Sequence, residues 1–419
     1  MSYAAAKLRT SIAVAAALSR AAVLSTAVAI SPAVGAAAEP AGAAPAYGTF
    51  ADATAGVPLL GELLSVDPIN RRGLLRPGGD LSPDRYNRFL GQPFALLPYG
   101  MVYYHGAPAE LKDVPLGTVL HGLFYLPPTG DDSVPRPNPK DKIDAGRLKY
   151  LVPQTHALLL EDDVSFYRRH GQAWRITGIE TSEADGRQFL VVTSVGKQAP
   201  GGLSGEQKFG VDAATRVWKG KEFAGLADIA PGLTVQVNLT WDPNWGYGKF
   251  HVLDLWLDEK AVETAAEIQR QTHIRYQRYH WLPGWIEEVA YDSTKRNGAG
   301  TVTVTLFGGL DPSLYDEVVG ARNAQLAVAE PTLRTWRKDQ DSQGGRVVDV
   351  KKSTDPPLGS SGIRLQIEVQ TVLEGFRAGN IVRVGTSTFP SGAIPPEERV
   401  NGVKDRSRTL SDMLPPPNE

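Results

Sequence analysis

The sequence contains no cysteine among its 419 residues. This absence excludes disulfide bonds, thiolate catalysis, cysteine-bound zinc and iron–sulfur clusters. It also excludes a lipoprotein anchor, because that modification needs a cysteine at the cleavage site. For an exported protein, the lack of disulfides is more typical of the bacterial periplasm or exterior than of a eukaryotic secretory route.

Common catalytic motifs are missing as well. The sequence has no P-loop, no dinucleotide-binding fingerprint and no HExxH motif. Its two Gly-Ser segments, residues 202–205 and 359–362, lack the GxSxG spacing of a nucleophile elbow. The paired carboxylates of a glycoside hydrolase have no local signature, so the 46 acidic residues keep that possibility open. A protein without catalytic activity is favoured, and the question of an enzyme stays open.

The chain also lacks an excess of charge of either sign. It has 44 basic and 46 acidic residues, a net charge of −2. A protein that binds nucleic acid normally carries a basic surplus or a basic stripe, which gives it long-range attraction to phosphate. We therefore expect no nucleic-acid partner.

Long hydrophobic runs are confined to the beginning of the chain. Lys7, Arg9 and Arg20 precede an apolar run at residues 21–31, and residues 32–38 offer A-x-A-like cleavage positions. This pattern predicts a signal peptide over residues 1–38 and an exported protein, periplasmic or extracellular, with no membrane insertion after its removal. Removing the signal would leave 41 basic and 46 acidic residues. The alternative is a disordered alanine-rich leader.

One sequence pattern, which we call the repeated phrase, occurs three times. A strand-like stretch is followed by a short acidic or polar step, then a glycine, then a second strand-like stretch. The glycines are Gly117, Gly232 and Gly379. The paired stretches are residues 94–104 with 111–121, residues 209–218 with 226–237, and residues 326–336 with 373–384. A glycine at the start of a strand permits the sharp bend with which a small sheet curls into a barrel.

These segments resemble the OB-like small-barrel domains of exported bacterial proteins of unknown function. The match is best over residues 209–237 and weakest over residues 94–121. The resemblance implies a fold that is mainly β with connecting helices, built from two or three OB-like small Greek-key barrel repeats. It implies no activity.

The repeats and the composition between them predict the order of domains. A helix is expected over residues 259–280, because Asp258 is a good N-cap, the interior has strong helix formers and Pro283 follows. The predicted segments are a signal peptide (1–38), a flexible linker (39–57), a degenerate β unit 1 (58–128), a linker (129–154), β unit 2 (155–257), a connecting helix (258–283), β unit 3 (284–390) and a proline-rich tail (391–419).

Two Arg–Trp pairs are candidate binding residues. Arg216 and Trp218 are two positions apart in one predicted strand, and so are Arg334 and Trp336, so each pair should project from one face. A guanidinium beside an indole could form a cation–π platform for a sugar ring or another flat ligand. Because the pair recurs, a structural role at the mouth of each barrel is the favoured interpretation.

A turn-rich segment supplies the best aromatic binding candidates. Trp241, Trp245 and Tyr247 lie among proline, asparagine and glycine residues, and exposed rings there would suit the C–H faces of a carbohydrate. The alternative is that these rings fold back onto the barrel.

Other polar residues have structural explanations. His170 and His280 occupy matched positions near predicted helix ends, where the helix dipole favours histidine. The acidic run at residues 161–163 could bind a divalent cation, but capping of a short following helix is favoured. His105 and His121 are only two of the ligands that a zinc site needs. We expect no metal ion and no cofactor.

The leading hypothesis is therefore an exported, non-catalytic binding or structural protein of the bacterial cell envelope, with carbohydrate or an envelope protein as its partner. The alternative is a hydrolase acting on envelope or extracellular polysaccharide. A deep pocket with converging acids would indicate the enzyme, and a shallow aromatic surface would indicate the binding protein.

Overall fold

The structure is a computed structural model. It describes residues 48–68, 70–77, 91–134, 151–241, 250–295, 298–328 and 342–390. The predicted signal peptide, the proline-rich tail, Trp245, Tyr247, Arg334 and Trp336 lie outside these residues. In the described part of the chain, no helix has the length and apolar character needed to cross a bilayer.

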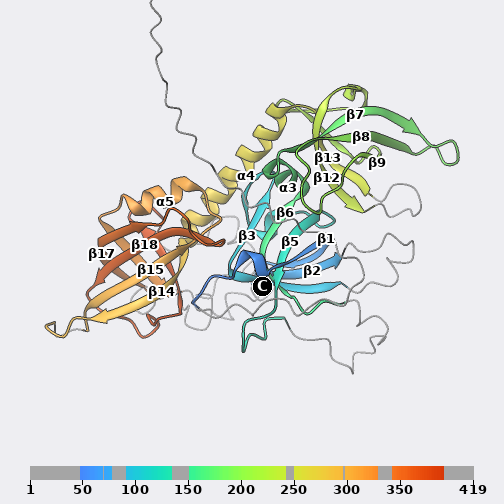
Figure 1. Ribbon diagram of the computed structural model, residues 1–419. Helices are drawn as coiled ribbons and strands as arrows, with labels where there is room; N and C mark the ends of the chain where they lie inside the picture. Colours follow the sequence, from blue (N-terminus) through green and yellow to red (C-terminus); the bar gives the residue numbers. More distant parts are fainter. Residues whose placement is uncertain are drawn as a thin grey trace, which may run out of the picture.

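Three small closed barrels make up the described chain, which confirms the prediction of a mainly β fold (Figure 1). In barrel 1, β1 is followed around the barrel by β2, β3, β6 and β5, and β3 and β6 run parallel. The short strand β4 pairs with β3 outside this circuit. The strands are β1 (Val57–Asp67), β2 (Arg72–Pro77), β3 (Gln92–Tyr104), β4 (Ala107–Ala109), β5 (Val119–Tyr125) and β6 (His156–Asp162).

Barrel 2 repeats this topology. Its circuit runs β7, β8, β9, β13, β12, and the parallel pair is β9–β13. A small hairpin, β10–β11, is attached outside the circuit through a parallel pairing of β10 with β13. The strands are β7 (Gln172–Thr181), β8 (Gln188–Gly196), β9 (Glu206–Val211), β10 (Arg216–Lys219), β11 (Glu222–Ala224), β12 (Thr234–Trp241) and β13 (Phe250–Trp256).

Barrel 3 has a different order. Six strands close it as β14, β15, β18, β17, β16, β19, and all neighbours are antiparallel. The strands are β14 (Leu282–Tyr291), β15 (Gly300–Phe307), β16 (Asn323–Val328), β17 (Ser342–Lys352), β18 (Ser360–Val369) and β19 (Ile381–Thr386). Unit 1, expected to be the degenerate copy, therefore shares its strand order with unit 2, whereas unit 3 departs from it.

In the described residues, three α-helices connect and cover the barrels. Helix α3 (Asp163–Arg169) follows β6, and α5 (Pro312–Val319) covers one side of barrel 3. The long helix α4 (Glu259–His280) runs diagonally from barrel 2 to barrel 3 in Figure 1. Its N-cap is Asp258, whose side chain accepts a hydrogen bond from the backbone N–H of Ala261 at 2.8 Å, as the sequence predicted.

One domain boundary differs from the sequence prediction. Strand β6 falls at the start of predicted unit 2, but it pairs with β5 and β3 and completes barrel 1. The reason is that a barrel of this topology needs a last strand parallel to its third, and the chain returns to supply it only after residues 135–150. Residues 129–154 are thus an insertion within barrel 1 rather than a linker between units.

The repeated phrase forms the same joint in all three barrels. The N–H of its glycine donates to a carbonyl in the first strand of that barrel, and the N–H of that strand residue donates back to the residue after the glycine, all at 2.8–2.9 Å. A β-bulge follows the strand residue each time. The pairs are Gly117 with Leu63, Gly232 with Ile176, and Gly379 with Ile286.

These glycines have φ values of +91°, +91° and +85°, which L side chains rarely adopt. At Gly232 a Cβ atom would meet no atom within 4 Å, so a substitution there tests backbone strain alone. We expect Gly232→Ala to lower the free energy of unfolding by about 1–2 kcal/mol. The measurement is chemical denaturation followed by tryptophan fluorescence.

The control for this prediction is Gly178→Ala in β7. A Cβ atom there also meets nothing within 4 Å, but its φ is not positive, so the substitution should cost nothing. If both variants changed the free energy of unfolding equally, a side chain at the positive φ of Gly232 would cause no backbone strain.

Side chains of neighbouring barrels also pack against one another. Val119 and Leu60 of barrel 1 pack with the apolar core of barrel 2. Tyr99 of barrel 1 meets Trp285 and Phe307 of barrel 3 edge to face, with ring centroids 6.1 and 6.0 Å apart. Aromatic packing of this kind holds barrels 1 and 3 against each other.

Candidate functional site

Arg216 and Trp218, predicted as a binding pair, meet on one carboxylate. Arg216 donates to both oxygens of Asp254, at 2.8 and 2.6 Å, and Trp218 Nε1 donates to Asp254 Oδ1 at 3.1 Å. The Asp254 side chain is only 3% exposed, whereas that of Arg216 is 44% exposed. The parallel register of β10 and β13, which places Arg216 opposite Asp254, produces this arrangement.

The exposed surface of this pair is completed by Phe223. Its ring stacks on that of Trp218, with centroids 3.9 Å apart and planes at 29°, and Phe223 is 69% exposed. Trp218 in turn packs against a buried cluster that includes Trp256 and Val262. We call Arg216, Trp218 and Phe223 the aromatic hairpin. It presents a phenyl face to solvent with a rigid support behind it.

The sequence analysis missed Phe223, although a local signal was present. Gly220 and Lys221 form a two-residue turn between the paired residues Lys219 and Glu222, and Gly220 has a φ of +62°. A glycine at the first position of a two-residue turn is a hairpin signal. That register would have placed Phe223 directly across from Trp218.

The charge at the aromatic hairpin is balanced. Burial opposes the charged form of Arg216, but the hydrogen bonds and the attraction of Asp254 outweigh it and raise the arginine pKa. Burial raises the pKa of the neighbouring Tyr104, and the charge of Asp254 acts in the same direction. The site therefore holds a fixed, neutral ion pair beside an aromatic face.

The aromatic turn predicted at residues 241–247 is described only at its first residue. Trp241 is the last residue of β12 and is 2% exposed. Its ring lies in the core of barrel 2, because it shares the inward register of Val235, Val237 and Leu239. This corrects the expectation for Trp241, whose ring is not open to a ligand.

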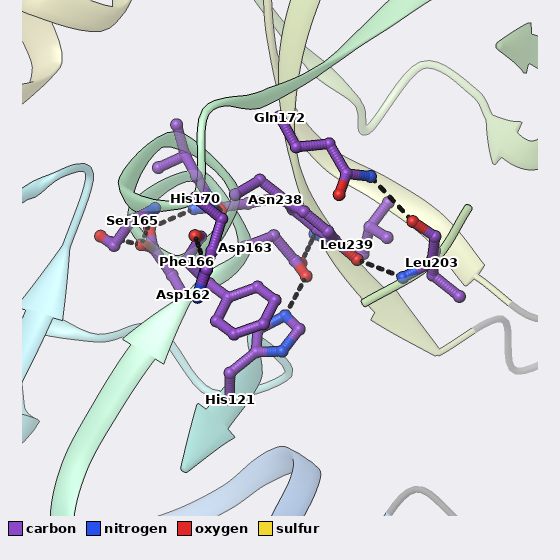
Figure 2. A network of polar contacts seen from close by, with 12 residues as sticks. His121, Asp162, Asp163, Ser165, Phe166, His170, Gln172, Leu203, Asn238 and Leu239 are labelled. Atoms are coloured by element: carbon purple, nitrogen blue, oxygen red, sulfur yellow. Dashed lines mark hydrogen bonds and ion pairs between the residues drawn. The ribbon is translucent and has the colours of Figure 1, made fainter. Parts of the chain in front are cut away.

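Two residues of the acidic run at 161–163, Asp162 and Asp163, join barrels 1 and 2 (Figure 2). Asp162 is the N-cap of α3 and accepts hydrogen bonds from the N–H groups of Ser165 and His105 and from Asn238 Nδ2, at 3.0, 2.8 and 2.7 Å. Burial raises the pKa of Asp162, and these hydrogen bonds act against that shift. The predicted capping role is confirmed.

The other two acids point to different partners. Asp163 accepts from Leu239 N and contacts His121 Nε2, both at 2.9 Å. Glu161 pairs with Arg169 through two bonds of 2.7 and 2.6 Å. The three carboxylates therefore do not converge, and the part of the chain that the structure describes has no group of three or more His, Asp or Glu that could hold a metal ion.

His170 and His280 have the matched structural roles that their positions suggested. Each places Nδ1 against the carbonyl oxygen four residues earlier, at 2.8 Å from Phe166 O and at 2.9 Å from Tyr276 O. Both rings thus satisfy carbonyl groups at a helix C-terminus, where positive charge is also favoured.

Comparisons with models of known protein families, with curated proteins and with solved structures gave no match for this chain.

Proposed function

We propose that the protein is an exported, non-catalytic binding protein of the bacterial cell envelope and that it binds glycans at the aromatic hairpin. The observation that carries this proposal is the exposed face of Phe223, stacked on a Trp218 that is itself fixed by packing and by Asp254. A rigid aromatic face loses little entropy when a ligand binds to it.

The chemistry around that face supports a carbohydrate ligand. Sugars present C–H groups on one face and hydroxyl groups at their edges. Phe223 offers the apolar surface, and Arg216 retains exposed N–H donors beyond those given to Asp254. Small barrels of this topology are used to bind oligosaccharides. The hairpin is attached to such a barrel, because β10 pairs with β13 of barrel 2.

The alternative, a polysaccharide hydrolase, finds less support at this site. Glycoside hydrolysis needs two carboxyl groups across the scissile bond, and one of them must be able to give up a proton. The carboxylate at the aromatic hairpin, Asp254, is buried and already accepts three hydrogen bonds. It is suited to hold Arg216 and Trp218 in place rather than to exchange protons with a substrate.

The proposal is tested by binding of the protein without its leader to a glycan array, followed by titration calorimetry with the best glycan. We expect Phe223→Ala to weaken binding about tenfold, the effect of losing one stacking contact of about 1.4 kcal/mol. Ile179→Ala, which removes another exposed hydrophobic side chain of barrel 2, should leave binding unchanged.

Wild-type affinity of Phe223→Ala would contradict the assignment of this site. In that case Trp245→Ala, in the segment between β12 and β13, is the next variant to measure. Release of reducing sugar from polysaccharide by the wild-type protein would favour the hydrolase.

A further inference from the structure

A concave surface lies on barrel 3, away from the aromatic hairpin of barrel 2. It is a hollow of about 800 Å³ where β16 begins, β17 passes and β18 ends. The polar side chains that line it include Lys295, Asn323, Gln325, Arg346, Glu368 and Gln370. The volume of the hollow is therefore large enough for several sugar-sized units, and its lining offers hydrogen-bonding groups beside apolar surface.

The single carboxylate in this lining is held between two cations. Lys295 Nζ lies 2.7 Å from one oxygen of Glu368, and Arg346 Nη2 lies 2.7 Å from the other. The hydrogen bonds from Lys295 and Arg346 lower the pKa of Glu368, so it stays ionised. Lys295 is also 3.4 Å from Asp292, which balances its charge further. With Asp292, which lies outside the lining, two carboxylates compensate the two cations at the hollow.

Three of the remaining polar side chains are amides. Asn323, Gln325 and Gln370 are exposed, and each can donate and accept hydrogen bonds. Gly344 pairs with Gln325, is exposed, and would have no atom within 4 Å of an added Cβ. A ligand can therefore approach the backbone there as well as the amide side chains. Paired donors and acceptors are what a hydroxyl group needs, because it both donates and accepts.

An exposed aromatic residue lies two strands away from the hollow. Tyr291, the last residue of β14, is 68% exposed and pairs with Gly300. Gly300 pairs in turn with Val369, which lines the hollow. Tyr291 is thus two strands away from Val369, at the same level of the barrel, so a chain that extends beyond the hollow can reach it.

We propose that this hollow is a second binding site and that it takes an uncharged, hydroxyl-rich chain such as a neutral oligosaccharide. The inference extends the proposed glycan-binding function, but it rests on a different barrel and on different residues. Compensated charge disfavours an anionic chain, and the amides and Tyr291 supply the polar and apolar contacts of a neutral sugar.

The test is a titration of the isotope-labelled, full-length protein with maltotetraose, cellotetraose and chitotetraose, followed by backbone amide NMR. We expect saturable shifts at Gln325, Gly344 and Gln370 with at least one of these sugars. Tyr291→Ala should weaken that binding about fivefold, with Tyr291→Phe retaining it. Val348→Ala, which removes another exposed side chain from β17, should bind as the wild type does.

The outcomes separate this site from the aromatic hairpin. Shifts confined to residues 216–224 would overturn the second site and leave the proposed function standing. Shifts confined to the hollow would support the second site and overturn the aromatic hairpin as the binding site. No shifts with any of the three sugars at millimolar concentration would overturn both. Equal shifts with tetragalacturonate would overturn the assignment to an uncharged ligand.

Discussion

Replacing Asp162 with alanine is expected to destabilise the protein by about 3–5 kcal/mol, because it leaves several buried donors without an acceptor. Asp162 is fully buried and accepts from the backbone N–H groups of His105 and Ser165 and from Asn238 Nδ2. These groups belong to barrel 1, to α3 and to barrel 2, so the variant would weaken the joint between the two barrels as well as the helix cap.

The measurement is the midpoint of chemical denaturation, followed by circular dichroism and tryptophan fluorescence. Glu183→Ala, which removes an exposed carboxylate between β7 and β8, is the control and should leave the midpoint unchanged. If Asp162→Ala unfolded at the wild-type midpoint, the hydrogen bonds at this joint would have to be replaceable by water.

Mild acid is expected to destabilise the protein, with His273 of α4 as a main contributor. His273 is 1% exposed, and neither of its ring nitrogens has a hydrogen-bond partner among the described residues. Burial lowers its pKa from the ordinary value of 6.5, although the charges of Glu110, Asp113 and Asp311 act in the opposite direction. The fourth nearby charge, Arg71, lowers the pKa further.

The surrounding acids have other partners. Glu110 accepts from Gln277 Nε2 at 2.7 Å, and Asp113 accepts from Gln269 Nε2 at 3.2 Å. Gln269 and Gln277 lie one turn before and one turn after His273 on the same buried face of α4. A proton on His273 would therefore place a cation among side chains that are already paired, which the folded state resists.

The sign of the pH effect follows from this lowered pKa. The folded protein binds a proton on His273 less readily than the unfolded chain does, so the stability is complete above about pH 6.5 and is lost as the pH falls below that value. One such group removes at most about 1.4 kcal/mol per pH unit. Burial also lowers the pKa values of His105, His156 and His170, which act in the same direction.

This prediction is checked by thermal or chemical unfolding between pH 7.5 and pH 5. We expect His273→Gln to flatten the loss of stability with acid, whereas Thr272→Ala, its exposed neighbour on α4, should keep the wild-type slope. An unchanged slope in His273→Gln would mean that the ring is protonated in the folded state or that it reaches water.

The parts of the fold that were predicted correctly depend on neighbouring residues. Asp162 and Asp258 cap helices through bonds to residues three positions ahead, and His170 and His280 contact carbonyl groups four positions back. The glycine of the repeated phrase was recognised from its spacing alone. The cap and histidine interactions are closed within about one turn of chain, so the local sequence was sufficient to predict them. The glycines bond to strand residues more than 50 positions away, so the sequence located the glycines but not their partners.

The candidate site could be predicted only in part. Arg216 and Trp218 were found because a strand places alternate residues on one face, but their shared partner Asp254 lies 38 positions away from Arg216. Trp241 was placed wrongly because it was assigned to the turn, although it continues the apolar alternation of Val235, Val237 and Leu239 in β12. The binding roles of Trp245, Tyr247, Arg334 and Trp336 stay predictions.

By itself, the sequence determined the mainly β class, the repeated phrase with Gly117, Gly232 and Gly379, the helix caps and the absence of cysteine chemistry. Only the tertiary structure decided that β6 closes barrel 1, that barrel 3 has its own strand order, and that Trp241 turns inward while Phe223 stays exposed. The physical reason is that turns and caps are stabilised within a few residues. Barrel closure, side-chain burial and the hollow at the end of barrel 3 depend on which distant strands pair and in which register.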